Sequence, residues 1–293
     1  MPPELIAFVN TAVVPIGLML IMFSMGLTLA LGDFRQVLSH RAAVLAGLGG
    51  QLLLMPLLAL GIGLLFRLPP ELALGLFILG ICPAGTTSNA LTFVGRGNVA
   101  LAVVLTALSS LVTVFSIPLL LSWALPHFAA GGAVPSLSVP GTMLQLIRIT
   151  LLPMAVGMIV RRFAPDAAQA MGRWLRPVSL IVLVAVIAFA VGVSLDMVLA
   201  NLLSAGPAIW VLNAAAMAVG LGLARLIRAD RANAMTLAIE VGVHNVTLAT
   251  FLTLTVLDNL PLAVTQNIYG VVMIVNALLL IRWFRRRAVR ERG

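Results

Sequence analysis

Long apolar segments follow one another along almost the whole chain, and only short polar connections separate them. A helix that crosses a bilayer needs about 20 predominantly apolar residues. We predict nine such helices, over residues 8–31, 43–66, 71–95, 98–122, 142–160, 177–198, 206–226, 232–256 and 262–283. No connection between them is long enough for a soluble domain. The sequence therefore predicts an all-α polytopic membrane protein.

The composition excludes several functional classes. Hydrophobic residues make up 61% of the chain and charged residues 9%, against about 45–50% and about 25% in soluble domains. Such a chain cannot cover a water-facing surface with polar groups, so a soluble enzyme is excluded. The single cysteine, Cys82, leaves no intramolecular disulfide and no cysteine cluster for a metal.

The arginines predict the orientation in the membrane. Of the 18 basic residues, all of them arginine, only Arg67 and Arg148 fall on one predicted side of the membrane. Because basic residues accumulate in cytoplasmic loops, we expect the N-terminus outside and the C-terminus inside, with a basic cytoplasmic tail at 284–293. The expected location is the inner (cytoplasmic) membrane of a cell. Arginines dispersed among short loops argue against a nucleic-acid partner.

Two of the predicted spans are interrupted by polar and helix-breaking residues. The span over 71–95 breaks at Cys82–Asn89, and the span over 232–256 breaks at Glu240–Asn245. Paired interrupted helices in the two halves of a membrane protein indicate the binding site of a secondary transporter. The breaks lie five spans apart, and this odd separation implies opposite orientations. We therefore predict a single transporter domain whose parts 8–122 and 142–283 form inverted repeats.

The residues at the breaks suit the binding of a small cation. Unwound backbone is tolerated at membrane depth only inside protein or along a cavity. Thr86, Thr87, Ser88 and Asn89 offer neutral oxygen ligands, and Glu240 is the one carboxylate deep inside a span. An ionisable residue at that depth is a functional-site candidate. The alternatives are a protonated structural acid for Glu240 and interhelical hydrogen bonding for the neutral residues.

The role of His244 stays open at this stage. Four residues separate it from Glu240, so the two side chains would share one face if the helix were unbroken. A lone imidazole here is a neutral hydrogen-bond partner, a proton-coupling group or a neighbour of a sodium site.

The sequences of both breaks resemble a known family. Residues 82–92, CPAGTTSNALT, followed by RGNVAL at 96–101, are similar to the signature of the bile acid:sodium symporter family. EVGVHN at 240–245 resembles the second crossover motif of that family, which has Gln at the position of His244. Gln51, four residues before Met55-Pro56, also matches. The resemblance covers nearly the whole chain in order.

This resemblance implies a fold and two sodium sites. The fold has a panel domain and a core domain, with two broken helices crossing in the core, here in the nine-helix form. The first sodium site would use Ser88, Asn89, Thr106 and Glu240, with Ala102 in place of one hydroxyl ligand. The second would use Gln51, Glu240, the backbone oxygens of Val241 and Val243, and His244 in place of Gln.

The resemblance also implies the substrate class. Members carry organic anions, and Thr86, with its neighbour Thr87, and Asn245 match positions that face substrate. We therefore expect sodium-coupled symport of a small carboxylate or sulfonate, with no organic cofactor and no obligate protein partner. The alternative is a proton-coupled or uncoupled exporter of a small anion or metalloid oxyanion on a related fold. A membrane sensor or scaffold is a third interpretation. An intramembrane enzyme is not supported, because the spans contain no Ser/His pair, Asp pair or set of zinc ligands.

Overall fold

The computed structural model describes residues 3–30, 32–33, 40–128 and 137–290, and these residues are almost entirely helical, with no β-strand among them. Seven helical stretches are long and apolar enough to cross a membrane, and two further spans are interrupted near their middle. All nine predicted apolar segments therefore correspond to helical spans in the described part of the chain. The last three residues of the predicted basic tail lie outside it.

The elements follow one another in a simple order. The uninterrupted α-helices are α8 (Val99–Phe128), α11 (Pro165–Val193), α12 (Leu195–Leu226) and α15 (Ala263–Arg290), the last preceded by a 3-10 turn at Leu260–Leu262. Three spans contain a π-helical turn between two α-helices: α1 (Pro3–Phe8) and α2 (Val14–Gly26), α4 (Arg41–Gly49) and α5 (Met55–Leu65), and α9 (Val139–Leu146) and α10 (Leu152–Phe163). The interrupted spans consist of α6 (Pro70–Ile81) with α7 (Thr86–Val94), and of α13 (Arg231–Gly242) with α14 (Val246–Phe251) and a π-helical turn at Leu252–Val256.

Prolines explain the three π-helical turns that join α-helices. In each case the second residue of the following helix is a proline, at Pro15, Pro56 and Pro153. A proline lacks the N–H that would close the α-helical hydrogen bond. The residue before it donates instead to a carbonyl five residues back, as Met55 does to Gly50. The helix continues, with one turn widened.

Two predicted boundaries are wrong for the same reason. The spans expected to begin at residues 177 and 206 begin at Pro165 and Leu195. Pro177 and Pro207 lie inside α11 and α12 rather than at their starts. Membrane helices tolerate an interior proline because other groups satisfy the freed carbonyl.

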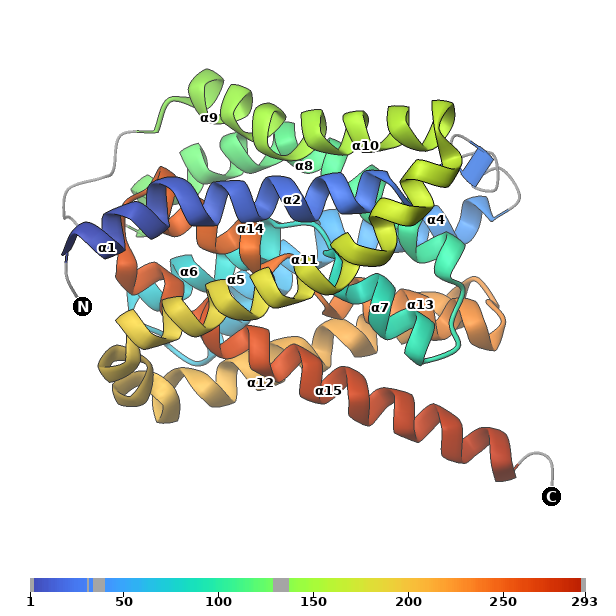
Figure 1. Cartoon of the computed structure of the whole chain (residues 1–293). Coiled ribbons are helices and arrows are strands. Elements are labelled where there is room, and N and C mark those ends of the chain that lie inside the picture. Colours follow the sequence, from blue (N-terminus) through green and yellow to red (C-terminus); the bar gives the residue numbers. More distant parts are fainter. Residues whose placement is uncertain (1–2, 31, 34–39, 129–136, 291–293) are drawn as a thin grey trace.

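The helices form two groups. In the first, α2 packs against α10 and α11, and Gly26 allows this approach, since a Cβ there would lie 2.1 Å from the Met154 carbonyl oxygen. In the second, α12 packs against α13 and α15, while α6 packs against α5 and α8. These groups correspond to the expected panel and core. Figure 1 shows that α1 begins and α15 ends at opposite ends of the bundle, as an odd number of spans requires.

The two interrupted helices cross at their breaks. Ala84 and His244 form an isolated antiparallel β-bridge, and the amide of Asn245 donates to the Pro83 carbonyl at 2.8 Å. In Figure 1, α6 and α14 lie towards the end where α1 begins, whereas α7 and α13 lie towards the end where α15 terminates. The predicted crossing is therefore confirmed, and it brings residues 160 positions apart into direct contact.

Candidate sodium and substrate site

The backbone at the crossing is unwound because the local sequence cannot continue a helix. The α6 helix ends at Ile81, directly before Cys82-Pro83, and α13 ends at Gly242. A Cβ added to Gly85 would lie 3.3 Å from the Cα of Asn245, so the two chains approach as closely as a glycine permits. Backbone groups of one break form hydrogen bonds with those of the other. This avoids the high free-energy cost of leaving them unsatisfied at membrane depth.

Glu240 lies in the last turn of α13 and is fully buried. Thr106 Oγ1 on α8 lies 3.1 Å from its Oε2 atom, and Gln51 Nε2, in the π-helical turn Gly50–Leu54, lies 3.3 Å from the same atom. Asn89 on α7 joins the cluster, because its Oδ1 lies 3.5 Å from Thr106 Oγ1. Every side chain that contacts this carboxyl group is neutral. The sequence-predicted cluster is therefore assembled, from four different helical spans.

The cluster contains more hydrogen-bond acceptors than donors. The Thr106 hydroxyl has one hydrogen, yet Glu240 Oε2, Ala102 O and Asn89 Oδ1 all lie within 3.5 Å of it. The Ser88 hydroxyl is used by the Gly85 carbonyl at 2.7 Å. Glu240 Oε1 and Gln51 Oε1 are buried without a partner. Because a buried acceptor without a donor is costly, this set of oxygens fits a small hard cation, which prefers oxygen ligands.

The residues of the second predicted sodium set form two hydrogen-bonded pairs, Gln51 with Glu240 and His244 with the Val241 carbonyl. Gln51 Nε2 donates to the Glu240 carbonyl at 3.0 Å. The ring nitrogens of His244 lie 2.8 Å from the Cys82 carbonyl oxygen and 3.1 Å from that of Val241. A neutral imidazole has one N–H, so one nitrogen directs a lone pair at a carbonyl oxygen. On one side of the ring, an acceptor nitrogen therefore faces an acceptor oxygen, that of Cys82 or that of Val241 according to the tautomer.

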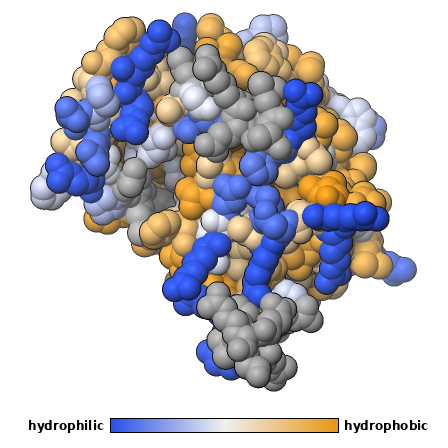
Figure 2. Space-filling model, turned by 90° about the vertical axis from the view of Figure 1, so that its right-hand side faces the viewer, coloured by the Kyte–Doolittle hydropathy of each residue, from blue (hydrophilic) through white to orange (hydrophobic). Residues whose placement is uncertain are grey.

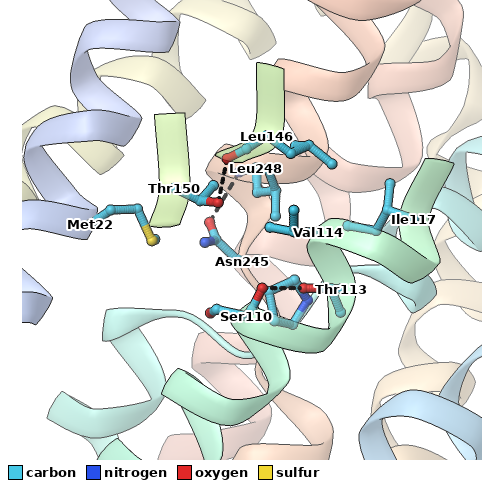
Figure 3. A pocket seen from close by; sticks show the side chains of 10 residues that line it. Met22, Ser110, Thr113, Val114, Ile117, Leu146, Thr150, Asn245 and Leu248 are labelled. Atoms are coloured by element: carbon cyan, nitrogen blue, oxygen red, sulfur yellow. Dashed lines mark hydrogen bonds between the residues drawn. The ribbon is translucent and has the colours of Figure 1, made fainter. Parts of the chain in front are cut away.

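Of the three predicted substrate residues, Asn245 lines a crevice beside the crossing, whereas Thr86 and Thr87 do not. Asn245 lines a narrow and mainly apolar crevice, too tight to admit a water molecule, between α2, α8, the π-helical turn Ile147–Leu151 and the crossing. Its Oδ1 caps α14 by accepting from Leu248 N at 3.0 Å, while its Nδ2 is buried without an acceptor. Figure 3 shows Asn245 between Thr150 and Ser110. Thr86 and Thr87 begin α7 and are half-buried, and neither lines this crevice.

Sequence reasoning missed a network behind the second break. Asn213 Nδ2 on α12 and the Tyr269 hydroxyl on α15 both donate to the Gly242 carbonyl, at 2.7 and 2.9 Å. Asn276 Nδ2 in turn donates to Asn213 Oδ1 at 2.9 Å. These bonds satisfy the last carbonyl of α13 and so fix the end of the helix that carries Glu240. The sequence feature that could have indicated this network is the presence of amide side chains in otherwise apolar spans.

In the described part of the chain, no three side chains of His, Cys, Asp or Glu converge on a possible metal site. A transition-metal centre of that kind is therefore absent from these residues. The oxygen-rich cluster around Glu240 is of a different type, since it combines one carboxylate with neutral amide and hydroxyl groups.

The amino-acid sequence matches a known family of transporters. The model of the Sodium Bile acid symporter family matches residues 15–201, which is more than half of the chain. The chain belongs to the sodium bile acid symporter family. The resemblance found in the two crossover motifs is thereby confirmed, and so is the fold class.

Family relatives come from bacteria, plants and animals. The chain is 33% identical to an uncharacterised sodium-dependent transporter of Bacillus subtilis, over 83% of this chain and 74% of that protein. It is 30% identical to a probable chloroplastic sodium/metabolite cotransporter of Arabidopsis thaliana, over 78% of this chain and 56% of that protein. It is 28% identical to the hepatic sodium/bile acid cotransporter of Rattus norvegicus, over 92% and 75%. The match thus spans little more than half of the plant protein.

The family and these relatives carry the names of symporters, cotransporters and transporters. The seven apolar helices and two interrupted spans agree with a multi-pass membrane protein. Sodium coupling is a property that the names of the relatives share.

Proposed function

We propose that this protein is a sodium-coupled symporter of a small organic anion in the cytoplasmic membrane, with its N-terminus outside and its C-terminus in the cytoplasm. One observation carries the proposal. The crossing of the broken helices buries a carboxylate, Glu240, among neutral groups whose acceptors outnumber their donors. A buried carboxylate without a cationic partner is strongly unfavourable, and one or two sodium ions would supply the missing charge.

The crevice beside the crossing supports the substrate class. Asn245 offers an unused N–H donor, and Ser110, Thr113 and Thr150 add hydroxyl groups, although each of these already donates to a backbone carbonyl. No charged side chain lines the crevice. Neutral donors beside sodium sites suit a single carboxylate or sulfonate, whose charge the bound cation balances. We place Thr86 and Thr87 at the other face of the same substrate path.

Transport by purified protein in sealed vesicles tests the proposal. A thermal-shift screen of small carboxylates and sulfonates, with and without sodium, first selects a substrate. We then expect an inward sodium gradient to drive its accumulation, and a potassium gradient of equal size to leave it at equilibrium. Accumulation driven by a proton gradient without sodium would contradict sodium coupling and establish the proton-coupled alternative.

Ala102→Ser tests the first sodium set. Ala102 is fully buried on α8, one turn before Thr106, and a hydroxyl there adds the oxygen that the family resemblance implies. We expect the sodium concentration for half-maximal uptake to fall by about three- to tenfold, because one good hydrogen-bond-like ligand contributes about 1 kcal/mol. The control is Ala107→Ser, a buried site on the same helix but on another face. An equal change in both variants would contradict the ligand role.

His244→Gln and His244→Leu test the second set. We expect His244→Gln to retain uptake, since an amide can still donate to one carbonyl at the crossing and direct its oxygen at a cation. His244→Leu removes the single ring N–H, so that one of the two carbonyls, of Cys82 or of Val241, loses its donor, and an unsatisfied buried group costs about 1–3 kcal/mol. We therefore expect His244→Leu to reduce sodium-driven uptake by at least about tenfold. Equal activity of the two variants would show that His244 serves only packing.

A further inference from the structure

A second groove lies between the end of α7 and the last turns of α15. Its lining residues are Val94, Leu278, Ile281, Arg282, Arg285 and Arg286, and its volume is about 420 Å³. It shares no lining residue with the crevice at the crossing. Arg285 Nη2 donates to the carbonyl of Val94, the last residue of α7, at 2.8 Å and so holds the two helices together.

The groove combines an apolar wall with a cationic mouth. Val94 and Leu278 are about half exposed. Figure 2 looks onto this end of the molecule, and its lower part shows long hydrophilic side chains across hydrophobic surface. The arginines lie where the apolar part of α15 ends.

The charges in the groove suit a phosphate group. Among the described residues, three guanidinium groups line it and no acidic side chain does. Arg285 uses one of its five N–H donors on the Val94 carbonyl, which leaves most of the donors free for a ligand. The planar fork of arginine matches the oxygens of a phosphate. Basic pockets between transmembrane helices at a membrane interface bind the head groups of anionic lipids.

We propose that this groove binds one anionic phospholipid, with its phosphodiester held by Arg282, Arg285 and Arg286 and an acyl chain against Val94, Leu278 and Ile281. The lipid would bridge α7 and α15, two helices that pack around the second interrupted span. The proposal concerns a structural lipid and is independent of which anion is transported or which ion drives transport.

Titration of the purified full-length protein with phosphatidylglycerol tests this site. Bound lipid is counted by native mass spectrometry, and the unfolding temperature is followed in parallel. The main variant is Arg282→Gln with Arg286→Gln, which spares the bond between Arg285 and Val94. The matched control is Arg162→Gln with Arg225→Gln, two exposed arginines on the same predicted side of the membrane. Phosphatidylcholine and inorganic phosphate serve as parallel probes.

We expect the wild type to retain phosphatidylglycerol in preference to phosphatidylcholine and to gain thermal stability from it. The main variant should bind phosphatidylglycerol at least about tenfold more weakly, because each arginine near an anionic lipid contributes about 1 kcal/mol. The control should match the wild type. Equal binding of phosphatidylcholine, equal weakening in the control or equal stabilisation by inorganic phosphate would each overturn the proposal.

Discussion

Glu240→Gln is expected to abolish sodium-driven uptake while leaving the protein folded. The substitution keeps the shape of the side chain but removes its charge and adds an N–H donor to a cluster that lacks donors. Both proposed sodium sites lose their only anionic ligand. Removing one partner of a buried ion pair costs about 3–5 kcal/mol, so sodium affinity should fall by a hundredfold or more, on the order of the corresponding equilibrium change.

Two measurements separate this effect from a loss of folding. Sodium should raise the unfolding temperature of the wild type, because a ligand that binds only the folded state stabilises it, and this shift should vanish in Glu240→Gln. The control is Glu71→Gln, which removes an exposed carboxylate from the first turn of α6. There only a weak helix-dipole interaction of about 0.3–1 kcal/mol is lost. Full sodium stimulation in Glu240→Gln would refute the assignment of both sites.

The sequence predicted the features that depend on membrane physics. Apolar length alone located all nine spans, and Cys82-Pro83 and the polar run from Glu240 located the two breaks. The crossing of the two breaks could not be predicted in this way, because the local sequence of one break does not show that it contacts the other. The resemblance of both breaks to the bile acid:sodium symporter family implied this crossing, and the bond from Asn245 to Pro83 confirms it.

The parts that sequence reasoning missed depend on packing between distant helices. The helices α11 and α12 begin earlier than predicted, and Pro177 and Pro207 lie inside them. The bonds of Asn213 and Tyr269 to the Gly242 carbonyl join three helices. Polar residues of this kind in membrane helices have many possible partners, so no local pattern in the sequence selects the right one.

The contact between α12 and α13 positions Glu240, and glycine makes it possible. A Cβ added to Gly220 on α12 would lie 2.4 Å from the Leu237 carbonyl oxygen and 2.7 Å from the Cα of Ala238. Both neighbours are backbone atoms of α13, less than one turn before Glu240. They cannot rotate away as a side chain would, so even a methyl group must push the two helices apart.

Gly220→Ala should therefore destabilise the protein and impair sodium binding together. Overpacking of a buried contact costs about 1–3 kcal/mol, and the displaced α13 would move Glu240 away from Thr106 and Gln51. Gly222→Ala is the matched control, since a Cβ there meets nothing within 4 Å. In that exposed helical position, alanine is favoured over glycine by about 0.5–1 kcal/mol. We expect the unfolding temperature to fall for Gly220→Ala and to stay the same or rise for Gly222→Ala, and equal shifts would contradict the close approach of the two helices.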